Sequence, residues 1–250
     1  MRVFYVTLLC FSSLFSCVSY AETGGISLAA TRVILSSDKN SAGLTVNNSS
    51  NQDSWLLRSW VTPYYTTGVK NEKIKAPVPF VMTPPLYRIE PDGKVQLRIN
   101  AVDVSSLPAD RESVFRINVM AIPPETKINR GKEKAAGELS GGKIQFAINN
   151  QIKLFYRPAG LNEKSGLDRA RKQLIFSLKE NTVDVNNPTP YFFTLVNIRV
   201  NGRPLSDEKK TDTMVAPFSH LQLPVSDARS MEYQTINDYG GNTDAEKVTF

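Results

Sequence analysis

The sequence predicts an all-β protein built from two antiparallel sandwiches. Short clusters of β-branched and aromatic residues recur along the 250-residue chain, and turn-forming residues separate them. Long stretches with helical periodicity are absent. The length fits two domains of about 100 residues each better than one large sandwich.

The first 21 residues predict an export signal. Arg2 supplies a positive charge, residues 3–18 form an apolar stretch, and Ser19-Tyr20-Ala21 has the small-x-small pattern of a cleavage site. No later segment approaches the roughly 20 apolar residues that a membrane-spanning helix needs. We therefore expect cleavage near Ala21 and no integral membrane segment afterwards. An uncleaved anchor is the alternative.

The composition excludes several kinds of chemistry for the chain that remains after cleavage. Both cysteines, Cys10 and Cys17, lie inside the signal, so cysteine catalysis, thiolate metal sites and disulfides are excluded after cleavage. The net charge of +6 favours anionic partners in general. Export argues against nucleic acid as one of them.

The predicted strands follow one another with turn markers between them. Ser37-Asp38-Lys39-Asn40 separates the first two clusters, Pro91-Asp92-Gly93 precedes the fourth, and Asn201-Gly202 predicts a tight hairpin after a strong strand. In chain order, the clusters are Thr31–Leu35, Leu44–Val46, Trp55–Val61, Val95–Ile99, Val114–Ile122, Ile144–Tyr156, Leu174–Leu178, Tyr191–Val200 and Ser219–Leu223.

A domain boundary is predicted near residue 160. There a long strand ends in Pro158-Ala159-Gly160, and the polar stretch Leu161–Arg171 follows. This gives an N-terminal domain over 22–160 and a C-terminal domain over 161–250.

One long segment, from Pro123 to Gly142, lacks the signals of strands and helices. It is either a solvated loop between two strands or a flexible arm that becomes ordered on a partner, because long loops in compact domains are often functional.

The sequence does not predict an enzyme. His220 is the only histidine, which excludes a site with two histidine ligands, and no nucleophile elbow, P-loop or dinucleotide-binding motif occurs. His220 lies in a predicted strand and is more typical of a strand residue than of a catalytic base. We expect no catalytic residue, metal or cofactor.

The segment from Lys143 to Pro158 is the most informative. It alternates with period two and is much longer than the usual strand of about five or six residues. It is either an interior strand that fills its own core or an edge strand that needs a partner. One face carries Ile144, Phe146, Ile148, Ile152, Leu154 and Tyr156, interrupted by Asn150.

The end of this segment, Ile152-Lys153-Leu154-Phe155-Tyr156-Arg157-Pro158, resembles the signature of the periplasmic pilus-assembly chaperones, the PapD-like family of Gram-negative bacteria. Further segments resemble that family's motifs in consistent order along nearly the whole mature chain. They are Thr31–Ile34, Thr83–Pro91, Leu107–Phe115, Ala121–Pro124, Asn187–Tyr191 and Ile236–Gly241.

The resemblance implies two immunoglobulin-like sandwiches set at an angle, with a cleft between them. It implies a periplasmic chaperone that stabilises pilin subunits by donating an edge strand and delivers them to an outer-membrane usher. The family's cleft arginine and lysine fall on Arg32 and Lys153, which would hold the carboxylate at the end of the subunit. Without the motif, Arg32 would be taken for a solvated surface charge.

The resemblance also assigns two further sets of residues. The donor strand would present Ile144, Phe146, Ile148 and Ile152, and Asn150 breaks that apolar row. Charges between the domains would be Glu112, Arg157 and Asp238.

Two other classes of protein remain as alternatives. An immunoglobulin-like adhesin or fibre subunit would usually be a single incomplete sandwich, and an exported hydrolase should show an activated nucleophile or a carboxylate pair. The stretch from Pro124 to Lys153 is long, as in the family's long-loop branch, but that branch typically carries a cysteine pair and this chain has none. The branch is therefore left open.

Overall fold

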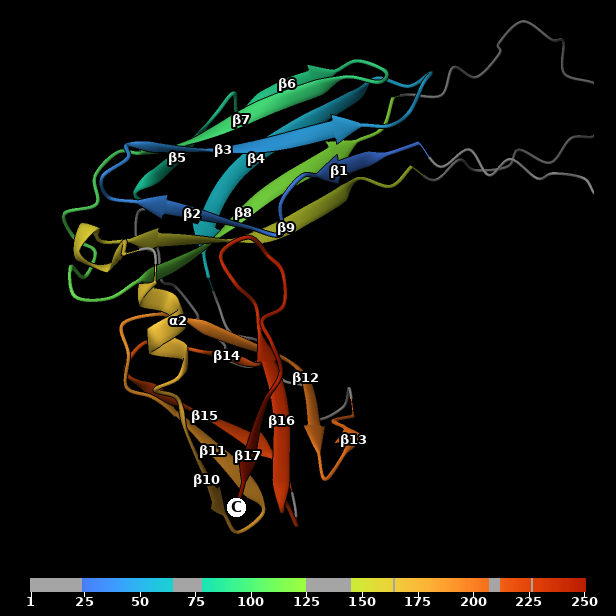
Figure 1. The fold of residues 1–250 in the computed structure, drawn as a ribbon. Coiled ribbons are helices and arrows are strands. Elements are labelled where there is room, and N and C mark those ends of the chain that lie inside the picture. The colour runs from blue at the N-terminus through green and yellow to red at the C-terminus, as the bar shows by residue number, and fades with distance from the viewer. Residues whose placement is uncertain (1–23, 65–77, 125–144, 164, 207–211, 226) are drawn as a thin grey trace, which may run out of the picture.

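The structure is a computed structural model and describes residues 24–64, 78–124, 145–163, 165–206, 212–225 and 227–250 (Figure 1). The predicted export signal, Ile144 and most of the long segment Pro123–Gly142 lie outside the described residues.

The N-terminal sandwich consists of two sheets. One sheet has the order β1-β3-β7-β5, formed by Ile26–Leu28, Ser41–Asn48, Lys94–Ala101 and Phe80–Thr83. The other has the order β2-β9-β8-β4-β6, formed by Arg32–Ser36, Ile148–Arg157, Ser113–Ile122, Trp55–Pro63 and Leu86–Ile89. Strand β9 runs antiparallel to β8 and parallel to β2.

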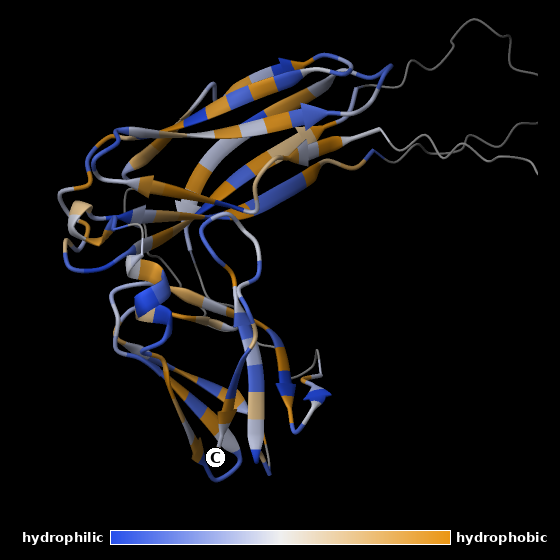
Figure 2. Ribbon diagram, viewed as in Figure 1, coloured by the Kyte–Doolittle hydropathy of each residue, from blue (hydrophilic) through white to orange (hydrophobic). Residues whose placement is uncertain are grey.

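The core between these sheets comes from alternate residues of each strand, as the period of two requires. Leu35, Leu44, Leu97, Ile117 and Leu154 are all fully or almost fully buried in it. Figure 2 shows the same alternation of apolar and polar residues along the strands of both sandwiches.

The C-terminal sandwich is built in the same way. One sheet has the order β10-β11-β15, formed by Ile175–Lys179, Thr182–Asn187 and Ser219–Pro224. The other has the order β13-β12-β16-β17, formed by Arg203–Pro204, Phe193–Val200, Ser230–Thr235 and Glu246–Thr249, and β14 (Met214–Val215) pairs with β12. Val183, Leu195, Leu223 and Met231 lie at the centre of its core.

The two sandwiches lie at an angle to each other, so the molecule is bent (Figure 1). A 3₁₀ helix, Ala159–Leu161, and the short helix α2, Gly166–Arg171, connect β9 to β10. The predicted division at residue 160 falls in this connection, and the exact boundary stays a prediction.

Each predicted cluster corresponds to a strand, with shifts of a few residues at the ends. The largest shift is in β9, which begins at Ile148 rather than Ile144, because Gln145–Ala147 do not pair as a strand. The hairpin at Asn201-Gly202 is confirmed: φ is 50° and 79° at these residues, as a tight two-residue turn between β12 and β13 requires. Strands β1, β5, β6, β11, β13, β14, β16 and β17 were not predicted.

Candidate functional site

Strand β9 has two halves with different surroundings. From Lys153 to Arg157 it lies between β2 and β8. From Ile148 to Ile152 it pairs with β8, and no other strand of the described residues pairs with it. The sequence left two alternatives for this segment, an interior strand and an edge strand. Each alternative is correct for one half of β9.

The side chains follow the same division. On the face directed at the N-terminal core, Ile148 is 58% exposed, whereas Leu154 is fully buried. Phe146, two residues before β9, is 73% exposed. Ile152 is half-buried against the core. Asn150 lies on this face opposite the buried Val119 and is half-buried. Apolar side chains thus emerge from the core along the half of β9 that pairs with β8 on one edge only.

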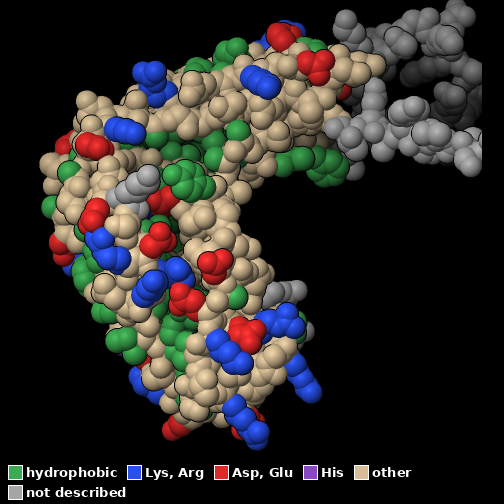
Figure 3. All heavy atoms as spheres, viewed as in Figure 1, with side chains coloured by type: hydrophobic (Ala, Val, Ile, Leu, Met, Phe, Trp, Pro, Cys, Tyr) green, Lys and Arg blue, Asp and Glu red, His purple; other side chains and the backbone are tan. Residues whose placement is uncertain are grey.

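The opposite face of the same sheet carries a row of cations. Arg32 on β2 lies opposite Lys153 on β9, and Lys153 lies opposite Arg116 on β8. Because directly opposed residues project to the same face, the three side chains are neighbours across three strands. They line a cavity of about 300 Å³ together with Tyr64, Gln151 and Ile236. Figure 3 shows that the surface of the molecule is hollowed between the two domains.

Arg32 is half-buried in this cavity and contacts the C-terminal domain. Its Nη1 donates a hydrogen bond to the carbonyl oxygen of Ile236 over 3.3 Å, and its guanidinium lies 5.5 Å from the centre of the Phe155 ring. Its Nε is buried without a hydrogen-bond partner. Burial lowers the pKa of Arg32, although the charges of Asp238 and Glu112 oppose that shift. A buried N–H group without a hydrogen-bond partner is uncommon in folded proteins.

Lys153 lies beside Arg32 and also reaches the C-terminal domain. Its Nζ donates to Thr194 Oγ1 over 3.4 Å and lies 5.4 Å from the centre of the Tyr64 ring. Burial is the largest cause of its lowered pKa. The charge of Asp212 opposes the shift, and the charges of Arg32 and Arg116 add to it. Partly buried cations this close together interact favourably with an anion.

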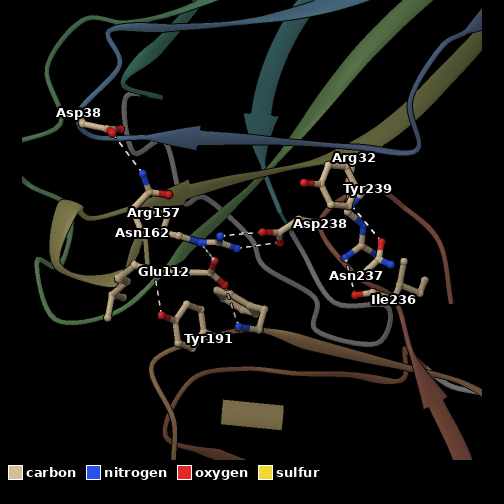
Figure 4. Close-up of polar contacts among 12 residues, drawn as sticks. Arg32, Asp38, Glu112, Arg157, Asn162, Tyr191, Ile236, Asn237, Asp238 and Tyr239 are labelled. Atoms are coloured by element: carbon tan, nitrogen blue, oxygen red, sulfur yellow. Dashed lines mark hydrogen bonds and ion pairs between the residues drawn. The ribbon is translucent and has the colours of Figure 1, made fainter. Parts of the chain in front are cut away.

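A second polar cluster joins the two domains (Figure 4). Arg157 Nε donates to Glu112 Oε1 over 2.7 Å, and Arg157 Nη1 and Nη2 donate to both oxygens of Asp238 over 2.7 and 2.8 Å. Glu112 Oε2 accepts the backbone N–H of Phe192 over 2.9 Å. Burial alone would lower the pKa of Arg157, but the two carboxylates raise it above its ordinary value.

The loop that carries Asp238 lies directly against β2. Gly240 has a φ of +85°, and a Cβ atom there would lie 2.2 Å from Oγ1 of Thr31. Both constraints favour glycine. The segment from Ile236 to Gly240 thus contacts two neighbouring residues: Gly240 lies against Thr31, and the Ile236 carbonyl accepts a hydrogen bond from Arg32.

The part of the chain that the structure describes holds no cluster of three or more histidine, cysteine or acidic residues placed to bind a metal. His220 lies in β15, with Nδ1 3.1 Å from Oδ2 of Asp184. None of the described helices is long and apolar enough to cross a membrane.

Comparison with known proteins identifies the family. Residues 25–162 match the family described as "Pili and flagellar-assembly chaperone, PapD N-terminal domain", and residues 169–247 match "Pili assembly chaperone PapD, C-terminal domain". The chain belongs to the PapD-like family of pilus-assembly chaperones. Its members are assembly chaperones and not enzymes, which favours this function over a fibre subunit or a hydrolase.

Several PapD-like chaperones are similar over most of their length. The chaperone protein PmfD of Proteus mirabilis is 35% identical, covering 97% of this chain and 90% of PmfD. The chaperone protein LpfB of Salmonella typhimurium is 36% identical, covering 87% of this chain and 85% of LpfB. A solved structure of the Salmonella enterica SafA pilin in complex with the SafB chaperone matches with a TM-score of 0.73 and 26% identity, covering 90% of this chain and 96% of that one.

The sequence indicated Arg32 and Lys153, but it did not indicate other residues that line this cavity. Arg116 and Tyr64 line the same cavity as Arg32 and Lys153. Arg116 lies within a predicted strand, and only the register with Lys153 places it in the cation row.

Proposed function

We propose that this PapD-like chaperone captures a pilin subunit by pairing one of the subunit's strands with the free half of β9. The observation that carries the proposal is that the unpaired edge from Ile148 to Ile152 ends at the pair Arg32 and Lys153. An edge strand with free backbone groups is a template for another strand.

The direction of the captured strand follows from the position of β2. Because β2 runs parallel to β9 and begins at Arg32, a parallel strand on the free edge would end there. Its terminal carboxylate would then meet Arg32 and Lys153. An antiparallel strand would instead bring an amino terminus to two cations, which like-charge repulsion disfavours. Each charge-assisted hydrogen bond to the carboxylate contributes about 1.5–3 kcal/mol.

The apolar row of β9 would fill the subunit at the same time. Phe146 and Ile148 are exposed in the free chain and can be buried in a subunit's incomplete core, with Ile152 continuing the row. Ile144 belongs to the same proposed set but lies outside the described residues. Fully burying a side chain of this size stabilises a complex by about 1.5–3 kcal/mol.

The remaining assignments follow from the family. We propose that the chain is exported to the periplasm, that its signal is cleaved near Ala21, and that it delivers subunits to an outer-membrane usher. The similar SafB chaperone in complex with a pilin supports the choice of a pilin as partner. The ion cluster of Glu112, Arg157 and Asp238 would fix the angle between the domains and so the position of the free edge.

Co-purification from the periplasm tests this function. The wild-type chain should recover a pilin subunit, and Arg32→Ala or Lys153→Ala should recover almost none while remaining folded. Arg98→Ala is the matched control, because Arg98 is exposed on β7 in the opposite sheet. Wild-type recovery by both cleft variants would refute the carboxylate site.

A further inference from the structure

The cavity between the domains is lined by a third cation, Arg116, besides Arg32 and Lys153. Arg116 lies directly opposite Lys153 in the sheet, on the side away from Arg32, and lines the same cavity. Its guanidinium lies 5.0 Å from the centre of the Tyr64 ring, the same ring that Lys153 Nζ approaches to 5.4 Å. Tyr64 thus has two cations beside it.

Arg116 and Lys153 repel each other across the sheet. Like charges on opposed residues of neighbouring strands repel one another, and burial makes that repulsion larger. The charge of Arg116 helps to lower the pKa of Lys153, which is the electrostatic sign of that repulsion. Asp212 offsets part of it: its Oδ2 accepts a hydrogen bond from the Tyr64 hydroxyl, and its charge raises the pKa of Lys153.

The balance of charges then indicates what the cavity can hold. Among the described residues, Arg32, Lys153 and Arg116 contribute three positive charges to this row. The charge of Asp212 acts on Lys153, and the charges of Asp238 and Glu112, which also bind Arg157, act on Arg32. A terminal carboxylate would bring one further negative charge. Its arrival therefore relieves repulsion among all three cations and not only between the two nearest to it.

We propose that Arg116 is a third cationic determinant of the anion site, which strengthens and makes more selective the recognition of a free chain-terminal carboxylate. The proposal rests on the proposed function and extends it to a residue outside the resemblance. Arg116 and Tyr64 form the wall of the cavity on the β8 and β4 side, and Arg32 forms the opposite wall.

The test compares a free acid with an amide. The probe is a synthetic peptide of the last strand of the subunit that co-purifies with the wild-type chain, prepared with a terminal carboxylate and with a terminal carboxamide. Affinities are measured for wild type, Arg116→Gln and Arg116→Lys. We expect Arg116→Gln to weaken binding of the acid about tenfold and of the amide less than twofold, with a shallower dependence on salt. Arg116→Lys should retain most of the affinity for the acid.

Two controls separate the possible failures. Arg58→Gln is the matched control, because Arg58 lies on β4 in the same sheet and stacks on Trp60 at 5.1 Å, outside the cavity. Arg32→Ala should abolish the preference for the acid if the proposed function is right. Arg116→Gln could lower the affinity for acid and amide equally, or lower neither. If Arg32→Ala still behaves as expected, either result would overturn the role of Arg116 alone. If no variant loses the preference for the acid over the amide, or if no subunit is recovered, the proposed function is wrong. This inference is then wrong as well.

Discussion

Lys153 is the cleft cation whose charge depends most on its surroundings. An arginine keeps its proton at any ordinary pH, whereas burial beside Arg32 and Arg116 lowers the pKa of Lys153. Since the protonated amine is the form that attracts a carboxylate, capture should be complete below that lowered pKa. It should be lost as the pH rises through it.

We therefore predict that subunit capture weakens on the alkaline side before an ordinary lysine, with a pKa of about 10.4, would lose its proton. Binding measured as a function of pH checks this. Lys153→Arg should extend capture to higher pH, because its side chain stays charged, although Thr194 and Tyr64 constrain how well it fits. The same alkaline limit in wild type and Lys153→Arg would show that another group sets it.

At this scale, the sequence predicted only part of the cation row. Arg32 and Lys153 came from motifs, and their neighbourhood in space follows from the pairing of β2 with β9. Arg116 could not be found in that way, because within Val114–Ile122 it looks like any outward-facing charge of a strand. Only the pairing register between β8 and β9 places Arg116 opposite Lys153, and the periodicity within one strand does not reveal that register.

Strand β9 shows why periodicity alone left two alternatives open. The same alternation runs through both halves, but Leu154 is fully buried between sheets while Ile148 is 58% exposed. The difference lies in β2, which covers the second half and not the first. Where strands were missed, they are short, as in β13 and β14, or carry few apolar residues, as in β16, where Met231 and Tyr233 supply the buried positions.

The two halves should respond differently to the same substitution. We predict that Phe146→Ser and Ile148→Ser leave the melting temperature within a few degrees of wild type and abolish subunit capture, because these side chains are exposed in the free chain. Leu154→Ser should lower the melting temperature by about 10 °C, because a large side chain is removed from a closed core.

Thermal melts of the purified variants, together with pull-downs of the subunit, make this comparison. Leu154→Ser is the matched control for Ile148→Ser, because both residues lie on the same face of β9. A large drop in melting temperature for both Phe146→Ser and Ile148→Ser would assign these residues to the protein's own core. Unchanged capture would remove them from the donor set.

At the scale of the whole molecule, the angle between the sandwiches sets the shape of the site. Arg32 and Lys153 each touch the C-terminal domain, at the carbonyl of Ile236 and the hydroxyl of Thr194. The two-domain architecture could be predicted from strand spacing, length and motifs. The resemblance also implied the charges between the domains, and Arg157 does bind Asp238. The contacts of Arg32 with Ile236 and of Lys153 with Thr194 could not be predicted, because they depend on how the two sandwiches meet in space.

Arg157 connects the two domains most directly. Its side chain is 7% exposed, and it is held by Glu112 at 2.7 Å from its own domain and by both oxygens of Asp238 from the other. Removing one partner of a buried arginine leaves its charge incompletely compensated. The bidentate contact also fixes the relative orientation of two planar groups, which a single hydrogen bond does not.

We predict that Asp238→Asn loosens the arrangement of the domains and lowers the free energy of unfolding by about 1–3 kcal/mol, with capture reduced as a consequence. Asparagine keeps the size of the side chain but loses the charge and one acceptor. Solution scattering should show a broader distribution of interdomain distances, and a thermal melt should show the loss of stability. Asp110→Asn is the control, since Asp110 pairs with Arg111 on the surface, where its side chain is 61% exposed. If Asp238→Asn scattered and melted as Asp110→Asn did, while capture still fell, the loop of Asp238 would contact the subunit directly and the orienting role of the ion cluster would be wrong.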